Sequence, residues 1–325
     1  MAKRRTRWFQ VLKPLSPRAK LVVGCLSFVL PTLVWSIVSY VPFVWHPQVL
    51  ITQPGSVEYL RPGMRMGKAA FADAVAQAKS ENREVPEGSP ANPIYLPAPH
   101  EVVRAFYTSF STPPLSQDGR WLHESLWHSI QVIFWGFFIA SLIGVPLGIL
   151  CGSYALAARL SEPFIEFFRY LPAPAFGALA VAILGIYDGP KVAIIVIGTL
   201  FQQVLIVANT TRKLDPGLVE AALTLGAKRA GTLLRRVIVP GILPDLYRDQ
   251  RILLGWAWTY LIVAELVGAS SGITWFITQQ ARYQHFENVY AAIIMIGIIG
   301  LGTDMLLALA GRRLFPWDRS LIKEA

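Results

Sequence analysis

Charged residues are scarce in this chain. Asp, Glu, Lys and Arg make up 15% of its 325 residues, whereas hydrophobic residues make up 54%. This is not the composition of a water-soluble protein, and it excludes the pair of soluble domains that the length alone would suggest. The 30 Lys and Arg outnumber the 20 Asp and Glu, but they cluster at the ends of apolar runs and form no single stripe, which excludes a nucleic-acid-binding module. The composition predicts an integral membrane protein.

Motifs for metals and nucleotides are also missing. The two cysteines, Cys25 and Cys151, lie inside apolar segments and lack the spacing of a disulfide framework or a zinc site. No histidines and carboxylates are spaced as metal ligands, and no Gly-x-x-x-x-Gly-Lys-Ser/Thr loop is present to hold the phosphates of ATP. We therefore expect this chain to bind no metal and no cofactor.

Six apolar segments are candidates for membrane-spanning helices, since a helix needs roughly 20 apolar residues to cross about 30 Å of hydrocarbon. The segments are residues 21–45, 129–151, 164–186, 192–208, 252–267 and 289–310. In the third segment, Pro172 and Pro174 predict an amphipathic start, a break and then a span from near Phe176. The fifth segment is followed by small residues at 268–272, which permit an unwound stretch. The predicted fold is an all-α membrane protein with six transmembrane helices.

Basic residues set the predicted orientation, because they mark cytoplasmic loops. Seven lie in the first 20 positions, eight in 212–251 and four in 312–325, which places both termini in the cytoplasm. The predicted regions are a basic cytoplasmic tail (1–20), a first transmembrane helix (21–45), an extracytoplasmic loop with short helices near 68–79 and 100–110 (46–125), a core (126–311) with a cytoplasmic loop at 211–250, and a cytoplasmic tail (312–325). The first helix is interpreted as a retained anchor, since its 25-residue run is too long for a cleaved signal peptide.

The cytoplasmic loop at 211–250 is the most informative part of the sequence. Asp215 and Pro216 are a capping residue and a favoured first helical residue, and Gly226 suits the position just after the helix. A second helix is expected at 228–239, ended by Pro240, with Pro244 opening the next helix. The loop carries too much charge to enter the membrane. A half-apolar helix here suits docking by a soluble partner or attachment to anionic lipid, and the spacing alone does not choose between them.

The same loop resembles the EAA loop of permease subunits from bacterial binding-protein-dependent ABC importers. The resemblance is carried by Glu220-Ala221-Ala222, by Gly226 after three intervening residues, and by Val239-Pro240. The match extends to the nitrate, sulfonate, taurine and bicarbonate branch of that family, through the segments at 96–102, 143–148, 168–172 and 263–273. Two features depart from the branch: thirteen residues separate Gly226 from Pro240, one more than usual, and the loop at 46–125 is much longer.

The resemblance implies a non-catalytic transport subunit of the bacterial inner (plasma) membrane. Its coupling helix would contact ABC ATPase subunits through Glu220, Ala221, Ala222, Gly226, Lys228, Arg229 and Pro240. ATP and Mg²⁺ would be bound by two such ATPase subunits, and a second copy of the permease would complete a homodimer. An extracytoplasmic substrate-binding protein would deliver a small solute such as nitrate, taurine, an alkanesulfonate or bicarbonate.

Candidates for the translocation path are polar residues inside the apolar segments. They are Gln202, Gln203, Glu265, Ser270 and Ser271. A carboxylate within a membrane helix costs about 2.5–3.5 kcal/mol on insertion scales, so Glu265 should face protein or water. It is either a path residue or a structural acid bonded to a helix end, and the glutamines either contact solute or join helices. Asp304 is interpreted as structural.

Two other functions are weighed against a permease. An intramembrane enzyme would need a nucleophile with a base, but Ser270, Ser271 and His285 come without a Gly-x-Ser-x-Gly elbow or an orienting acid. A secondary transporter that works without ATP would show paired halves with matching broken helices, whereas only one half of this chain contains the large loop. Both alternatives are less favoured.

Overall fold

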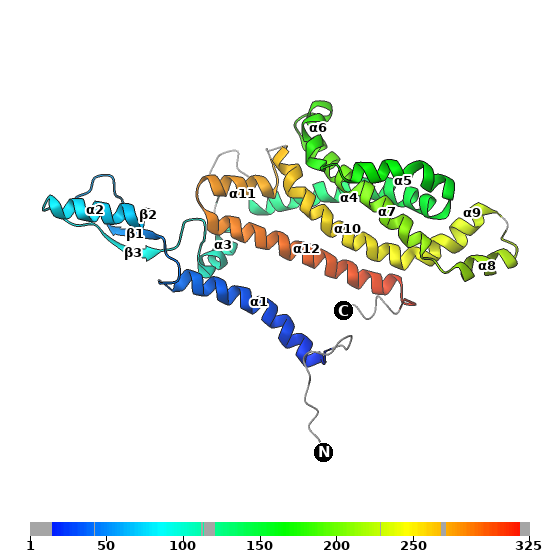
Figure 1. Cartoon of the computed structure of the whole chain (residues 1–325), viewed down its shortest axis with the longest axis horizontal. Coiled ribbons are helices and arrows are strands. Elements are labelled where there is room, and N and C mark those ends of the chain that lie inside the picture. Colours follow the sequence, from blue (N-terminus) through cyan, green and yellow to red (C-terminus); the bar gives the residue numbers. More distant parts are fainter. Residues whose placement is uncertain are drawn as a thin grey trace, which may run out of the picture. The chain divides into compact units, whose positions relative to one another are not determined.

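The computed structural model describes residues 15–41, 43–111, 113, 121–227, 229–267 and 271–318 (Figure 1). The chain divides into two compact units. The smaller unit comprises Met1–Thr108 and Gln284–Ala291, and the larger unit comprises Ser109–Tyr283 and Ala292–Ala325. The two units are described separately below.

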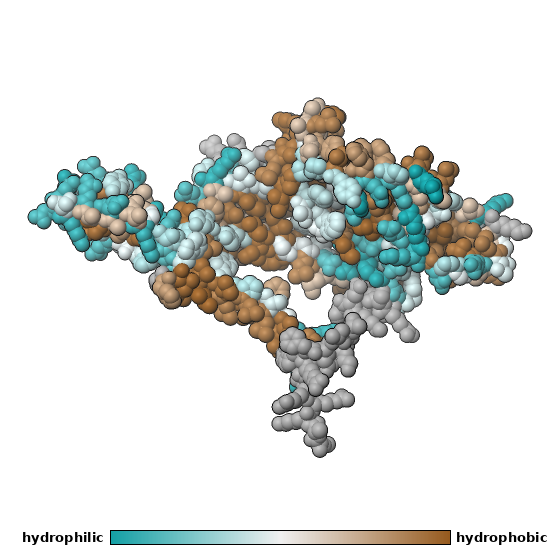
Figure 2. All heavy atoms as spheres, in the orientation of Figure 1, coloured by the Kyte–Doolittle hydropathy of each residue, from teal (hydrophilic) through white to brown (hydrophobic). Residues whose placement is uncertain are grey.

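Helix α1 (Pro17–Tyr40) opens the smaller unit. The Ser16 side chain caps it by accepting a hydrogen bond from the Ala19 N–H at 3.3 Å, and Pro17 occupies the first turn. None of its most apolar 18-residue stretch is buried within the protein, and Figure 2 shows hydrophobic residues along it. Since 24 residues extend about 36 Å, α1 is long enough to cross a bilayer.

The segment after α1 forms a small sheet that the sequence did not predict. Strands β1 (Gln48–Gln53), β2 (Arg65–Gly67) and β3 (Glu87–Ala91) pair antiparallel in the order β2-β1-β3. Helix α2 (Lys68–Ser80) contributes Ala74 to a core with Ile51 and Leu60. The sequence of β3, EGSPA, has no strand signal, and its pairing depends on Gly88, where a Cβ atom would clash with Val49. Helices α2 and α3 (Pro99–Ser111) were expected.

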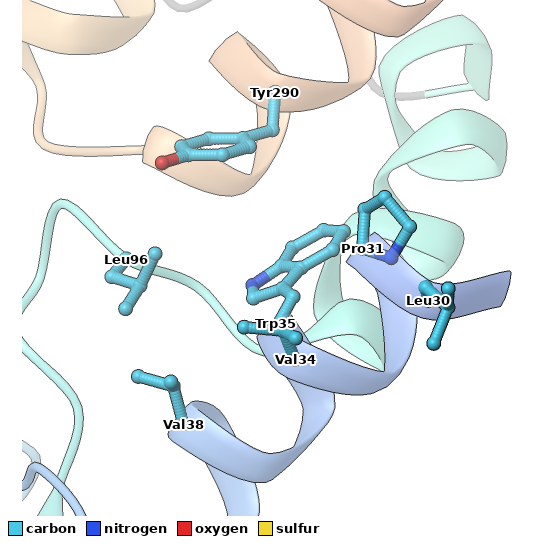
Figure 3. A pocket seen from close by; sticks show the side chains of 7 residues that line it. All are labelled: Leu30, Pro31, Val34, Trp35, Val38, Leu96 and Tyr290. Carbon is cyan, nitrogen blue, oxygen red and sulfur yellow. The ribbon is translucent and has the colours of Figure 1, made fainter. Parts of the chain in front are cut away.

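Trp35 of α1 ties the smaller unit together. Its Nε1 donates a hydrogen bond to the Pro97 carbonyl at 3.1 Å, and its ring stacks on that of Tyr290 with 5.8 Å between centroids. Around these two rings lies an apolar cavity of about 590 Å³ (Figure 3). Its remaining lining residues are Leu30, Pro31, Val34, Val38 and Leu96. These contacts attach α1 to the segment before α3 and to the first turns of α12.

The larger unit is helical. Its elements are α4 (Leu122–Ser153), α5 (Ala155–Arg169), the 3₁₀ turn η1 (Ala173–Phe176), α6 (Gly177–Leu184), α7 (Asp188–Arg212), α8 (Pro216–Thr224), α9 (Ala230–Leu233), the π-helical turn η2 (Leu234–Ile238), α10 (Val239–Val267), α11 (Ile273–Arg282) and the part of α12 (Phe286–Leu314) from residue 292. The largest buried cluster joins α4, α7, α10 and α11, with Leu122, Ile194, Leu261 and Ile273 wholly buried.

Helix α4 packs on α7 through small residues at every fourth position. The series is Gly136, Ala140, Gly144, Gly148 and Gly152. A Cβ atom at Gly136 would lie 2.6 Å from Ile195 Cγ2, and one at Gly148 would lie 2.6 Å from Val207 Cβ. This spacing keeps the small residues on one face, so the two backbones approach closely, as is typical of packed membrane helices.

Four helices are long and apolar enough to cross a membrane, judged by length and composition: α1, α4, α7 and α12. They correspond to the predicted segments 21–45, 129–151, 192–208 and 289–310, although α1 ends at Tyr40. The pair formed by α5 and residues 173–184 is bent by 89° and counts as a fifth if it is one broken span. The predicted helical membrane fold is confirmed, with the small sheet as an addition, whereas the count of six spans is not.

The predicted third and fifth spans differ from the structure. Helix α6 has eight residues, about 12 Å of rise, because the 3₁₀ turn with Pro174 precedes it and Gly185, at φ 82°, ends it. The predicted span at 252–267 is the second half of α10, whose 29 residues begin at Val239. Residues 245–251 at its start include two Asp and two Arg, which lower its mean hydropathy.

The predicted break at Pro240 is wrong. Helix α9 continues through the π-helical turn η2 into α10, which contains both Pro240 and Pro244. In that turn the Val239 N–H bonds to the Leu234 carbonyl, five residues back. Pro240 lacks an N–H group, and the wider turn before it leaves room for its ring, so the helix continues where the sequence predicts a stop.

Candidate functional site

Helix α8 has well-formed caps at both ends. The Asp215 carboxylate accepts a hydrogen bond from the Gly217 N–H at 2.9 Å, and Pro216 is the first helical residue. At the other end, the Ala227 N–H bonds to the Ala222 carbonyl and the Gly226 N–H to the Leu223 carbonyl, both at 3.0 Å. Gly226 has φ 91°, so these bonds form a Schellman motif, with Gly226 in the position just after the helix that the sequence predicted.

No residue of α8 is buried. The side chains of Leu218 and Leu223 are about half exposed, at 50% and 47%, and Leu225 just after the helix is 89% exposed. Of the predicted coupling residues, Glu220 and Ala221 on α8 are exposed and Ala222 is partly so. Gly226 after α8, Arg229 before α9 and Pro240 in α10 are also exposed, while Lys228 lies outside the described residues. Three of the predicted residues therefore lie on a short, accessible, partly apolar helix.

The base of α8 is anchored in the larger unit. Leu214, which precedes α8, and Leu234 and Val239, which follow it, pack on buried Ile149, Val207, Ile242 and Leu246. Figure 1 shows α8 and α9 at the end of the larger unit that lies away from α11. The helix is thus held at both of its ends on α7 and α10 while its own side chains stay accessible.

Glu265 is 1% exposed and lies near the end of α10, with its carboxylate against the first turn of α11. Its Oε1 accepts a hydrogen bond from Ser129 Oγ at 2.5 Å, and its Oε2 accepts one from the Thr274 N–H at 2.8 Å. Ser129 Oγ in turn accepts from the Ile273 N–H at 2.8 Å. The carboxylate therefore accepts from one N–H group in the first turn of a helix directly and is linked to another through Ser129, where a negative charge is favoured by the helix dipole. This is the geometry expected of the structural alternative for Glu265.

Sequence reasoning missed a second buried group beside it, Lys191. This ammonium is 0% exposed and donates to Asp188 Oδ1 at 3.0 Å and to Ser271 Oγ at 2.6 Å. His128 Nε2 lies 2.9 Å from Asp188 Oδ2. The available signal was a lysine directly before the apolar segment 192–208, three residues after Asp188. Of the predicted path serines, Ser271 belongs to this cluster, and Ser270 lies outside the described residues.

Gln203 joins three helices. It is 0% exposed, and its Nε2 donates to Ser141 Oγ of α4 at 2.8 Å and to Gln250 Oε1 of α10. Gln202 is partly exposed and does not belong to this network. Among the described residues, no group of three or more His, Cys, Asp or Glu could hold a metal ion. The buried polar groups described here thus either join helices by hydrogen bonds or pair opposite charges.

Comparison with known proteins shows the family to which the chain belongs. Residues 144–316 match the family described as "Binding-protein-dependent transport system inner membrane component". A "Probable ABC transporter permease protein" of Brucella abortus is 34% identical over 69% of this chain and 87% of its own length. The taurine transport system permease protein of Escherichia coli is 30% identical over 70% of this chain and 81% of its own. The chain therefore belongs to this family of inner-membrane permease subunits of ABC transporters.

A solved structure has the same fold. The inward-facing MetNI methionine ABC transporter matches with a TM-score of 0.53 at 21% identity, over 64% of this chain and 99% of its own. The family match and the two sequence relatives confirm the resemblance of the loop at 211–250 at the level of the family.

Proposed function

We propose that two copies of this permease form the path for a small oxyanion or sulfonate, and that two ABC ATPase subunits, which bind ATP and Mg²⁺, drive them through α8. An extracytoplasmic binding protein delivers the solute. The observation that carries this proposal is α8 itself: a helix capped at both ends, anchored at its base, and without a buried side chain.

The surface of α8 favours a protein partner over lipid. A helix of nine residues is marginal in water by itself, so its caps and its anchored base hold it in place. Glu220 is the only charged residue in α8, and an acidic residue gains nothing from an anionic lipid surface. Exposed leucines beside a single carboxylate instead suit a groove on another protein, which would bury the leucines.

Helix α8 is connected to two long helices of the larger unit. It joins the end of α7 to the run α9, η2 and α10, and these helices lead to the Lys191 and Glu265 groups at their other ends. A partner that moved α8 would therefore displace α7 and α10 together. This supports a coupling role for Glu220, Ala221, Ala222, Gly226, Lys228, Arg229 and Pro240.

The proposed solute is based on a relative, and the proposed path is based on polar residues in the apolar segments. The taurine permease of Escherichia coli, to which the chain is similar, is named for an aminosulfonate. Gln202, Gln203, Glu265, Ser270 and Ser271 stay the predicted path residues, but the contacts of Glu265 and Gln203 also satisfy a helix-joining role. Their replacement would separate a change in solute affinity from a loss of assembly.

Reconstitution with and without the ATPase tests the proposal. Glu220→Lys should leave membrane insertion intact and reduce both ATPase co-purification and ATP-dependent uptake by about tenfold or more, because it reverses the charge of a docked surface. Glu166→Lys makes the same change on an exposed residue of α5 and should behave as the wild type. Equal ATPase recovery in the two variants would contradict the coupling role, and uptake without the ATPase would indicate a secondary transporter.

A further inference from the structure

A cavity of about 230 Å³ lies between α10 and α12 in the larger unit. It combines one cation, one anion, a tryptophan and two glycines. The main lining residues are Arg251, Leu254, Gly255, Trp258, Gly300 and Asp304. None of them belongs to α8 or to the predicted path residues, so the cavity is not part of the groups described above.

Arg251 and Asp304 form a two-point ion pair at this cavity. Arg251 Nε lies 3.0 Å from Asp304 Oδ1, and Arg251 Nη2 lies 2.9 Å from Asp304 Oδ2. Parallel bonds of this kind orient both charged groups. The Arg251 side chain is 14% exposed, whereas that of Asp304 is 47% exposed, so the carboxylate keeps an accessible side.

The accessible side of Asp304 must face water or protein. Asp304 lies within α12, one of the helices apolar enough to span the membrane, and its neighbours Leu301, Met305 and Leu306 are exposed hydrophobic residues. A half-exposed carboxylate turned toward lipid tails would be strongly disfavoured. The cavity therefore opens toward an aqueous path or toward a second copy of the permease.

The two glycines leave the cavity open without serving helix packing. A Cβ atom at Gly255 or Gly300 would meet nothing within 4 Å, unlike one at Gly136 or Gly148, which would clash with α7. A glycine inside a helix costs up to about 1 kcal/mol relative to alanine, and here no close helix contact offsets that cost. The missing side chains instead make room beside the ion pair.

We propose that this cavity contacts the transported solute, and that it takes a zwitterion with an ammonium group and a sulfonate or carboxylate a few atoms apart. The proposal rests on the importer function above. A simple anion would meet a guanidinium already neutralised by a carboxylate, whereas a zwitterion places its ammonium on Asp304 and its anion toward Arg251. Trp258 and Leu254 then cover the short carbon chain between the two charges.

Equilibrium binding to the permease–ATPase complex, without the binding protein, tests the proposal. The probes are radiolabelled 2-aminoethanesulfonate and ethanesulfonate, which differ in the ammonium group. The wild type should bind the aminosulfonate about tenfold more tightly, and Asp304→Asn should remove that preference. Equal binding of the two probes, or no binding of the aminosulfonate, would overturn the assignment.

A second variant keeps the ion pair and fills the space. Gly300→Leu should reduce aminosulfonate binding by about tenfold, because the new side chain occupies the cavity. Gly297→Leu is the matched control: it lies one turn earlier on α12, also has open space around it, and does not line the cavity. Equal binding of the aminosulfonate in these two variants would show that the cavity does not hold the solute and that the ion pair only joins α10 to α12.

The failure of this proposal is distinguishable from that of the proposed function. If the wild-type complex retains its ATPase and carries out ATP-dependent uptake while the cavity variants bind the solute normally, only the cavity assignment is wrong. If the wild-type chain retains no ATPase, the importer function itself is wrong.

Discussion

The two ends of α10 are built in opposite ways. Near its start, α8 has no buried residue and exposes leucines, and its backbone is held by caps. Near its end, Glu265, Lys191 and Ser271 are buried, and each makes a hydrogen bond to another segment of the chain. The difference separates a surface prepared for a partner from an interior fixed within the chain. Substitutions should therefore damage folding at one end and only docking at the other.

The largest expected effect is at Gly272. This residue has φ 103°, and a Cβ atom there would overlap the Glu265 carboxylate. Gly272→Ala should lower the free energy of unfolding by about 3 kcal/mol or more, since it adds a buried clash to the cost of the left-handed backbone. Thermal unfolding of the purified permease measures the effect.

Gly185→Ala separates the two costs. Gly185 also has a positive φ, 82°, but a Cβ atom there meets nothing within 4 Å. Only the backbone cost, about 1–2 kcal/mol, should remain. Equal losses in the two variants would show that the Glu265 carboxylate does not fix the start of α11.

A smaller effect is expected from Lys191→Met. The variant removes the buried ammonium and leaves Ser271 Oγ and Asp188 without that donor, but Asp188 is half exposed and keeps His128. The loss of stability should be about 1–2 kcal/mol, which is less than for an ion pair whose members are both buried. Denaturant unfolding followed by tryptophan fluorescence would detect it. An unchanged midpoint would mean that the ammonium is not needed to hold this end of α10.

The smallest effect on folding is expected at the other end. Leu225→Ser alters a side chain that is 89% exposed, so the free energy of unfolding should change by no more than about 0.5 kcal/mol. Recovery of the ATPase should nevertheless fall, because the leucine would be buried by the partner. A large loss of stability with normal ATPase recovery would reverse the comparison between the two ends.

The sequence predicted the parts of the fold that local signals determine. The caps at Asp215 and Gly226 form as expected, because each depends on a few neighbouring residues. The apolar runs of α4, α7 and α12 are likewise long enough to be recognised without tertiary information. The coupling role of residues 220–240 stays a prediction, which the sequence could make because these residues lie in one short segment.

The features that were missed depend on contacts between distant segments. Lys191 meets Ser271, which is 80 residues away, and β3 forms only because β1 supplies its partner. The partners of Glu265, Ser129 and Thr274, belong to different helices, so the sequence left its role open. The continuation through Pro240 was missed for a different reason: proline usually ends a helix, and the π-helical turn that accommodates it has no sequence signature of its own.

The π-helical turn lies within the thirteen residues between Gly226 and Pro240, a spacing that the resemblance implies is one residue longer than usual. A turn closed by a bond to the fifth preceding residue takes up one residue more than an α-helical turn. One additional residue is therefore taken up before α10 begins, and the rotational phase of that helix does not depend on it. Arg251 and Glu265 keep the angular positions that they would have after a connection one residue shorter, so the length of the connection between α8 and α10 can change without rotating α10.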